Sequence, residues 1–532
     1  MRWLIPGTER VAGEAMGLEG QGGCAVIGKM VWKDLRLNVM TFKFAVGTVV
    51  CVVLTAVLVP VLMRDYRTRL EAYSANVATV QAELRRSKVY GNILSTRVYR
   101  PPSPLSVFSR GIESQVGDSA RIGSFSVPEI GGGSIAGNPY LAIFRHLDLS
   151  LLYQIVLSLL ALLIACDAIS SERAAGTLKL TMSGTVARHR VLLGKLLAGL
   201  MTLALPLTVA FLLAILMLSA SPSVDLSASD GARLGLMYVA TMLFVWAIYS
   251  GGIFVSCATR HPTTSLMLGL FFWIVVAMVL PNAGGYLAAQ FRPLEPPEPI
   301  RLQLSALEEE YFFKGTGAAD QIKLTGHGVQ REETGLRRYD LVCDANRIEQ
   351  LAKREAIMQP YWDEYSDKSW QIEHRYIETL YAQERLAAHF SRVSPVCAYE
   401  NVMAALAGTD VARCRDFVDR ARAYRRDVIE YIRAKTHNYT SPLYFTPSTE
   451  ADRAEYQQYL DGRMMDEEFE QWKKKKIAQV RPLNLDDFPR FVCRSSLLPD
   501  LRRTLTDVSV LVFAGALFFA LSFAAFMKYD VR

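Results

Sequence analysis

The sequence predicts a mainly α-helical membrane protein, with six transmembrane helices and a large, mostly helical extracytoplasmic domain between the fifth and the sixth. Of its 532 residues, 51% are hydrophobic and 21% are charged, and the mean hydropathy is +0.16. A soluble chain of this length usually has a negative mean hydropathy. Six apolar runs are long enough to cross a bilayer, and two long segments with many charges interrupt them. This pattern excludes a small secreted domain, a disordered chain and a bare helical bundle.

The six apolar runs predict the transmembrane helices in order. They are Phe44–Met63, Leu149–Cys166, Val191–Leu218, Leu234–Ser256, Ser265–Ala283 and Val508–Met527. The third run contains Pro206, which predicts a kink in that helix. No run carries a charge near its middle, so we expect no proton relay inside the bilayer and no energy source within the spans.

Basic residues in the short flanking segments predict the orientation. They fall on one side of the membrane if the spans alternate: Lys29, Lys33, Arg36, Lys43, Arg173, Lys179, Arg188, Arg190, Lys195, Arg260, Lys528 and Arg532. The loop Ser219–Arg233, on the other side, holds two aspartates and one arginine. Because Lys and Arg collect in cytoplasmic loops, we expect both termini to be cytoplasmic.

The spans divide the chain into parts with different expected structures. The glycine-rich residues 1–28 are expected to be disordered. Residues 29–63 are expected to form an amphipathic helix and the first span, and 64–148 an extracytoplasmic loop or subdomain. Residues 149–283 hold spans two to five, 284–507 the extracytoplasmic domain, and 508–532 the last span and a cytoplasmic tail. Within the large domain, Trp362–Phe390 and Val411–Ala434 repeat apolar residues at helical spacing. Core packing between antiparallel helices explains these stripes better than a ligand groove.

The sequence lacks the motifs of a catalytic protein. The string His189–Leu196 has the Gly-Lys pair of a P-loop but lacks its first glycine and its Ser or Thr. No HExxH or GxSxG motif is present, and the seven histidines lack the spacing of metal ligands. We therefore expect neither an enzyme nor a metal or cofactor site in this chain. The net charge of +7 is modest and gives no reason to expect a nucleic-acid partner.

Two segments near the predicted cytoplasmic surface are more informative. In Asp167–Gly194, Ser170 or Ser171 can cap a short helix with Glu172 in its first turn, and Gly176 then breaks it. Before the first span, Trp32, Leu35 and Val39 line one face of an amphipathic helix, as in helices that lie at a membrane surface.

These segments carry a resemblance to a known family. Ser171–Leu180 (SERAAGTLKL), followed by Gly194–Lys195, resembles the E-x-x-x-G-T-L…G-K signature of type-2 ATP-binding-cassette (ABC) exporter permeases. The resemblance implies that residues 167–190 contain a coupling helix, in which Glu172, Gly176, Thr177 and Leu178 contact a separate ATPase subunit. That subunit would bind ATP and magnesium. The helix with Trp32 is similar to the family's elbow helix.

The resemblance also implies partners and a location. A second permease chain, identical or related, and the surrounding membrane lipids would be partners in a bacterial cytoplasmic (inner) membrane. Ser394–Pro395, Ala407–Asp410 and the ending Tyr529–Arg532 resemble a bacterial subfamily with a large domain between spans five and six. The common exporters lack so large an insertion, so the substrate stays open. Export is one expected function, and the other is mechanotransmission, in which ATP hydrolysis moves the outer domain against an envelope partner.

Four cysteines fall in the predicted outer domain: Cys343, Cys397, Cys414 and Cys493. An even number of cysteines in an oxidising compartment predicts two disulfides, for which three pairings are possible. The alternative is four buried thiols.

Overall fold

Six helices of the computed structural model are long and apolar enough to cross a membrane, within the residues that the structure describes. Those residues are 23–528, with gaps at 88–92, 94–95, 114–116, 124–127, 132–147, 184–186, 223, 225, 294–295, 326–327, 334–336, 436–445, 448, 480–481 and 494–496. The six helices are α3 (Phe42–Arg86), α5 (Leu149–Ala174), α7 (Arg188–Ser219), α8 (Ala228–Ala258), the continuous stretch Pro262–Phe291 and α17 (Leu497–Met527). Each contains one predicted run, so the six-helix prediction is confirmed.

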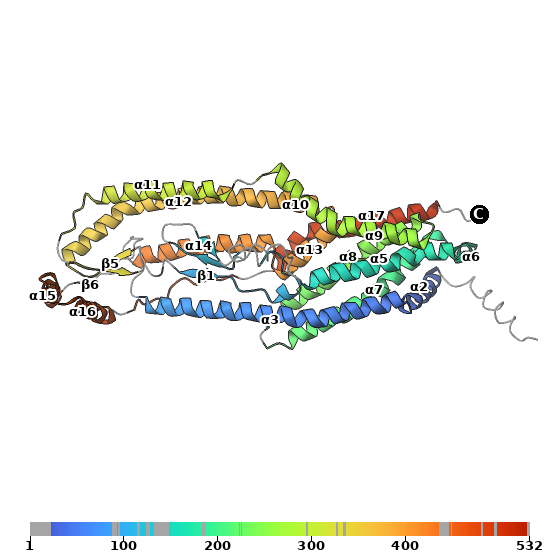
Figure 1. Ribbon diagram of the computed structural model, residues 1–532, viewed down its shortest axis with the longest axis horizontal. Helices are drawn as coiled ribbons and strands as arrows, with labels where there is room; N and C mark the ends of the chain where they lie inside the picture. The colour runs from blue at the N-terminus through green and yellow to red at the C-terminus, as the bar shows by residue number, and fades with distance from the viewer. Residues whose placement is uncertain are drawn as a thin grey trace, which may run out of the picture.

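The molecule is elongated, with the six-helix bundle at one end and an extramembrane domain at the other (Figure 1). The helix α2 (Gly23–Val39), the short helix α6 (Thr177–Ser183) and the C-terminal end of α17 lie together at the outer tip of the bundle. Because Lys and Arg gather there, we call this the basic end, and the opposite one the domain end. Of the residues expected to be disordered, 23–28 belong to α2, and 1–22 lie outside the described residues.

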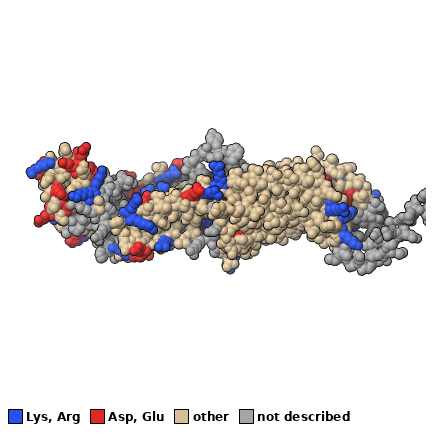
Figure 2. Space-filling view, turned by 90° about the horizontal axis from the view of Figure 1, so that it is seen from below, with Lys and Arg blue, Asp and Glu red and all other residues tan. Residues whose placement is uncertain are grey.

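On the face shown in Figure 2, the surface of the bundle is a broad band almost free of charged side chains. Lys and Arg border it at the basic end, and both signs of charge appear beyond it at the domain end. Large apolar side chains are exposed in this band, among them Val57, Leu212, Phe271 and Phe513. In water such a surface would be unfavourable, and in a bilayer it faces lipid. The band therefore marks the membrane-embedded part.

The first span does not end where its apolar run ends. Helix α3 continues from Phe42 to Arg86, which at 1.5 Å per residue is about 67 Å, or about twice the hydrocarbon thickness of a bilayer. No glycine or proline occurs between Pro60 and Gly91, so nothing in the sequence breaks the helix after the membrane. Asp65 and Arg69 also form an ion pair one turn apart, at 2.9 Å. One rigid helix therefore joins the bundle to the far domain.

The fifth span contains a local irregularity that receives a contact from elsewhere. Helices α9 (Pro262–Ile274) and α10 (Leu280–Phe291) are joined by the π-helical turn η3 (Val275–Val279). A π turn leaves a backbone carbonyl available to a partner outside the helix. Ser394 Oγ donates to the carbonyl of Val276 at 2.7 Å. This bond fixes the start of the next inserted element, α13.

Helix α13 (Pro395–Ala407) is part of the bundle, although it lies in the segment predicted to be extracytoplasmic. It packs against α8 and α17. Ser394 caps its start, and Gly408, with φ of +70°, ends it. Arg233 of α8 donates to the carbonyl of Leu406 at 2.9 Å. The strings Ser394–Pro395 and Ala407–Asp410 are therefore the two ends of this inserted helix.

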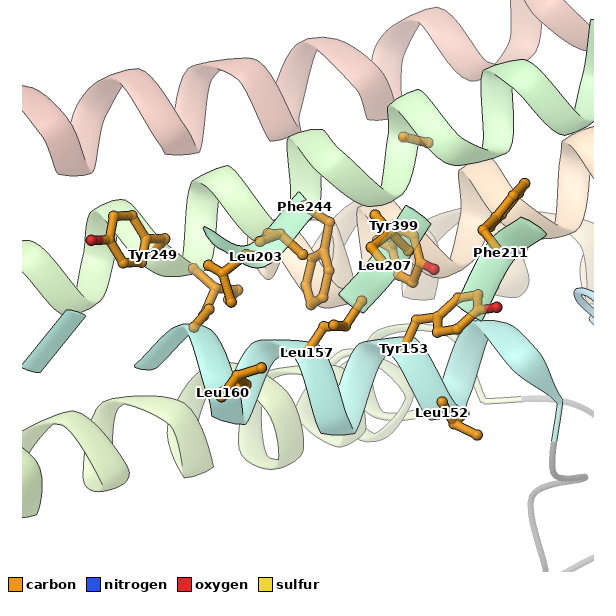
Figure 3. Close-up of a cluster of buried hydrophobic side chains, with 14 of the residues drawn as sticks. Leu152, Tyr153, Leu157, Leu160, Leu203, Leu207, Phe211, Phe244, Tyr249 and Tyr399 are labelled. Carbon is orange, nitrogen blue, oxygen red and sulfur yellow. The ribbon is translucent and has the colours of Figure 1, made fainter. Parts of the chain in front are cut away.

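The core of the bundle is built from aromatic and leucine side chains of α5, α7, α8 and α13 that point toward one another (Figure 3). Tyr399 of α13 stacks on Phe244 of α8, with ring centroids 4.6 Å apart, and its hydroxyl lies 3.2 Å from Thr241 Oγ1. Tyr153 of α5 and Phe211 of α7 pack at 6.2 Å. Because Tyr399 is fully buried among span residues, α13 is an integral part of this core.

The two long extramembrane segments form one domain with a shared core. The first segment supplies the short helix η1 (Pro104–Val107) and an antiparallel sheet of β1 (Arg97–Tyr99), β2 (Ser119–Arg121) and β3 (Glu129–Gly131). The second supplies α14 (Val411–Lys435). Ile93, Val98, Ala120 and Ile122 pack against Phe417, Ala421, Tyr424, Val428 and Ile432 of α14. The apolar stripe predicted for Val411–Ala434 therefore covers the sheet of the other segment.

The rest of the domain is a helical pair with small elements at its tip. Helices α11 (Pro297–Ala319) and α12 (Ala345–Ser391) run side by side (Figure 1). Trp362 of α12 packs against Phe312 of α11, which confirms that the aromatic stripe is helix packing. The tip contains an antiparallel pair, β4 (Gly328–Glu333) and β5 (Arg337–Cys343), with β6 (Thr446–Pro447) parallel to β5, and helices α15 (Glu450–Leu460) and α16 (Asp466–Gln479).

The two predicted disulfides are not formed in the structure. Cys397, Cys414 and Cys493 are thiols and not halves of disulfides. Cys397 is buried in α13 within the bundle, whereas Cys414 belongs to α14 and accepts a hydrogen bond from Arg100 Nη1 at 3.1 Å. The side chain of Cys343 lies outside the described residues. The prediction fails because it placed residue 397 in the extramembrane domain.

The packing of α13 gives a stability prediction. Tyr399→Ala should destabilise the purified chain by about 3–5 kcal/mol, because it removes a fully buried ring from the core. Tyr399→Phe keeps the ring and loses only the contact with Thr241, so it should cost about 1 kcal/mol. Thermal unfolding in detergent measures both. Equal, small effects of the two substitutions would show that α13 is not part of the bundle core.

Candidate coupling site at the basic end

Glu172 lies in the last turn of α5, not in the first turn of a separate short helix. The prediction is wrong because Ser170 and Ser171 do not cap a new helix. Their hydroxyls donate to the carbonyls one turn earlier in α5, those of Cys166 and Asp167. Serine bonded in this way lets the helix continue. The apolar second span therefore carries Glu172 to the basic end on one unbroken helix.

Gly176 ends this helix, as expected for a glycine that breaks it, and it does so in the left-handed conformation. Its φ is +74°, and its N–H donates to the carbonyl of Arg173 at 3.2 Å. A Cβ at this position would meet nothing within 4 Å, so the requirement for glycine comes from the backbone alone. A residue with a side chain would cost about 1–2 kcal/mol in this conformation. The turn after α5 thus has a fixed shape.

The short helix α6 starts directly after the turn. Thr177 is exposed, and its hydroxyl lies 3.3 Å from the carbonyl of Glu172, to which it donates. Leu178 is only 1% exposed and belongs to the bundle core. The expectation that Leu178 is presented to a partner is therefore wrong, because this side chain anchors α6 to its own chain. The accessible surface consists of Ala174, Ala175, Gly176, Thr177 and Lys179.

A charged network lies directly behind this surface. Lys195 of α7 contacts Glu172 of α5 at 2.8 Å and Asp34 of α2 at 3.5 Å. The Lys195 side chain is 8% exposed, that of Asp34 15% and that of Glu172 25%. A carboxylate in the last turn of a helix is disfavoured by the helix dipole, and the ammonium group of Lys195 offsets this. The network joins three helices at one buried cation.

The elbow helix α2 is attached to the bundle by further contacts. Met30 of α2 packs beside Gly194 of α7, where a Cβ would lie at an ordinary contact distance of 3.6 Å from it. Asn38 Nδ2 donates to Thr202 Oγ1 at 3.4 Å, and Lys43, at the start of α3, pairs with Asp167 of α5. These contacts tie α2 and the first span to the coupling region.

The apolar face predicted for the elbow is only partly covered by the bundle, and the rest of it is exposed. Trp32 is 68% exposed and Val39 is 37% exposed, whereas Leu35 is half-buried. Phe42, at the start of α3, is also exposed. Exposed tryptophan and apolar side chains beside basic residues are typical of a helix at the membrane interface.

No catalytic or metal chemistry is suggested by this site. Within the part of the chain that the structure describes, no group of three or more His, Cys, Asp or Glu could hold a metal ion. The arrangement offers a shaped, exposed turn and an ion network that links helices. It can therefore receive and transmit a mechanical displacement.

The fold and the site define a class of protein, a multi-pass membrane protein with an amphipathic helix before the first span and a short helix between spans two and three. The model of a family described as ABC-2 family transporter protein matches residues 29–531. The chain belongs to this family. Its members are membrane components of ABC transporters, generally not catalytic themselves, and in general work with an ABC ATPase. The curated proteins contain no significant match to the chain.

Sequence reasoning missed two features of the site. Asp34 belongs to no motif, and only its position on the elbow, within reach of the Gly194–Lys195 pair, could have indicated it. The burial of Leu178 could not be seen, because a segment as short as Thr177–Ser183 shows no clear helical periodicity. Lys195, noted only as part of a signature, is the residue that joins the elbow to the second span.

The network predicts how the chain responds to loss of its cation. Lys195→Met should destabilise the chain by about 2–5 kcal/mol, because Asp34 and Glu172 are left as partly buried, unpaired carboxylates. Thermal unfolding in nanodiscs measures the effect. Lys179→Met, which removes an exposed cation on α6, should change stability by less than about 0.5 kcal/mol. A triple variant that adds Asp34→Asn and Glu172→Gln should recover most of the loss. A stable Lys195→Met single variant would contradict the network.

Proposed function

We propose that this permease is the membrane subunit of an ATP-driven exporter in the bacterial cytoplasmic membrane. Two permease chains, identical or related, would pair with two ATPase subunits, and ATP and magnesium would bind to the ATPases alone. One observation carries the proposal: the exposed turn Ala174–Thr177 lies directly on the Lys195 network that joins α2, α5 and α7.

The residues of the site have separate roles in this proposal. The turn Ala174–Thr177 and Lys179 form the surface that the ATPase contacts. Gly176 gives the turn its shape, and Leu178 holds α6 on the bundle. Glu172 acts mainly within the chain, through Lys195. When the ATPases close, a push on the turn would move α2, α5 and α7 together and shift the bundle between inward- and outward-facing arrangements.

The proposed orientation places the basic end in the cytoplasm and the extramembrane domain outside. Its support is the distribution of charge, with Lys and Arg bordering one end of the charge-poor band (Figure 2). Cytoplasmic flanks of membrane helices are rich in these residues. Both termini would then be cytoplasmic.

Mechanotransmission is the second candidate, and the continuous helix α3 favours it. This helix follows directly after the elbow and extends into the extramembrane domain without a break. A rigid helix of this kind can carry movement from the basic end to an envelope partner outside. ATP hydrolysis that is coupled to the permease, but drives no uptake of solute into inverted vesicles, would favour this function over export.

The coupling role predicts the behaviour of two variants. Gly176→Val and Glu172→Ala should leave the chain inserted in the membrane but reduce ATPase activity in the assembled complex about tenfold or more, the effect of about 1.4 kcal/mol. Valine is strained in the left-handed conformation, and loss of Glu172 detaches α5 from Lys195. Co-purification and ATP hydrolysis in nanodiscs are the measurements. Lys314→Ala is the control, because it removes only an exposed ion pair with Glu310 on α11. Normal coupling in both variants would remove the role assigned to the turn.

The orientation predicts which positions react with a membrane-impermeant maleimide. A cysteine in place of Glu450, exposed on α15, should be labelled in intact cells. A cysteine in place of Lys179 should be labelled only after the membrane is permeabilised. The unsubstituted chain controls for the native thiols. The reverse pattern of labelling would overturn the proposed topology.

A further inference from the structure

A cavity of about 600 Å³ opens where the bundle meets the extramembrane domain. Its wall is formed by the loop 109–112, the first turns of α5, the last turns of α12, the end of α13 and the starts of α14 and α17. Cavities of this size bind small molecules up to the size of a short peptide. Neither the coupling site nor the proposed mechanism uses it.

The floor of the cavity contains a polar group without a partner. Gln154, in the second turn of α5, is 3% exposed, and its Oε1 has no hydrogen-bond partner among the described residues. An unsatisfied buried acceptor costs about 1–3 kcal/mol, so a donor that reaches it from a water, an ion or a ligand is favoured.

Two carboxylates of the wall form no close ion pair among the described residues. Glu384 of α12 lines the cavity, and Arg392 and Arg385 act on it only at longer range. Arg503 acts in the same way on Asp410. Asp410 accepts only backbone N–H groups, one of them from Arg413 at 3.1 Å. Burial raises the pKa of Asp410 above its usual range. A positively charged donor would satisfy both groups.

Cations that are only weakly engaged line the same cavity. Arg385 reaches Glu378 at 4.0 Å, but Glu378 already pairs closely with Arg415. Arg503 lies 3.7 Å from Asp500, which already holds Arg233 at 2.6 Å. The Arg385 and Arg503 side chains are 61% and 43% exposed, so both guanidinium groups can turn toward a carboxylate ligand. In contrast, Arg392 and Asp507 form a closed pair at 2.7 Å.

We propose that this cavity binds a zwitterionic ligand of the amino-acid or short-peptide class. The ammonium group of the ligand would lie between Glu384, Asp410 and Gln154 Oε1, and its carboxylate would be bound by Arg385 and Arg503. A purely cationic ligand would leave the two arginines with only their present long contacts, and a purely anionic one would leave the acceptors unsatisfied. The site is independent of the coupling proposal, because binding to the permease alone defines it.

Four forms of one peptide test the proposal by calorimetry, with the purified chain in nanodiscs. Triglycine should bind saturably, whereas triglycinamide and N-acetyl-triglycine, which each keep one charge, should bind at least tenfold more weakly. N-acetyl-triglycinamide, which has no charge, should not bind. No ATPase is present, so this result is separate from the coupling experiment.

Substitutions in the cavity wall test which residue binds the ammonium group of the ligand and which binds its carboxylate. Glu384→Gln should weaken triglycine at least tenfold but leave the weak binding of N-acetyl-triglycine unchanged. Arg385→Gln should weaken triglycine and N-acetyl-triglycine but not triglycinamide. Glu349→Gln, an exposed carboxylate far along α12 from the cavity wall, is the matched control, and thermal unfolding checks that each variant is folded. Absence of triglycine binding, equal binding of a singly charged form, or indifference to both substitutions would overturn the proposal.

Discussion

Charged side chains that are buried at the two ends of the membrane bundle must be paired, and these pairs hold the helices in place. At the basic end, Lys195 joins Asp34 and Glu172. At the domain end, Arg233 pairs with Asp500 and also bonds the backbone of α13, and Arg392 pairs with Asp507. Removing one member of such a pair leaves an uncompensated charge in a medium of low dielectric constant. In the middle of the bundle, buried apolar side chains stabilise the fold. At its two ends, the ion pairs determine which helices lie next to one another.

The same pairs explain how the two parts of the molecule can act together. Because α13 packs against α8 and α17 and its C-terminal end bonds to the first extramembrane segment, it links the bundle to the domain by direct contacts. Thr409, for example, donates to the carbonyl of Ser109 at 3.0 Å. A tightly packed core transmits a shift from one contact to the next. Helix α5 is continuous from the basic end to the wall of the cavity, which its first turns help to form.

The sequence predicted what depends on local composition. Six apolar runs specify six helices, and helical spacing in Val411–Ala434 specifies α14, because burial acts on each segment separately. The position of α13 depends on partners such as Arg233 and Val276, more than a hundred residues away, so its apolar sequence was assigned to the outer domain together with Cys397. Glu172 was misplaced because a serine can either cap a helix or bond within it. The helix break at Gly176 was predicted, since glycine is the residue type that tolerates backbone conformations closed to others.

The central claim is that the exposed turn after α5 moves as one body with the elbow and α7. Spin labels on cysteines in place of Arg36, on α2, and Lys179, on α6, measure the distance across this unit by pulsed electron paramagnetic resonance in the complex with the ATPase. The account predicts the same Arg36–Lys179 distance with and without trapped ATP, while the distance between the two Lys179 positions of the permease pair changes. A change of the Arg36–Lys179 distance as large as the one between the two chains would contradict it.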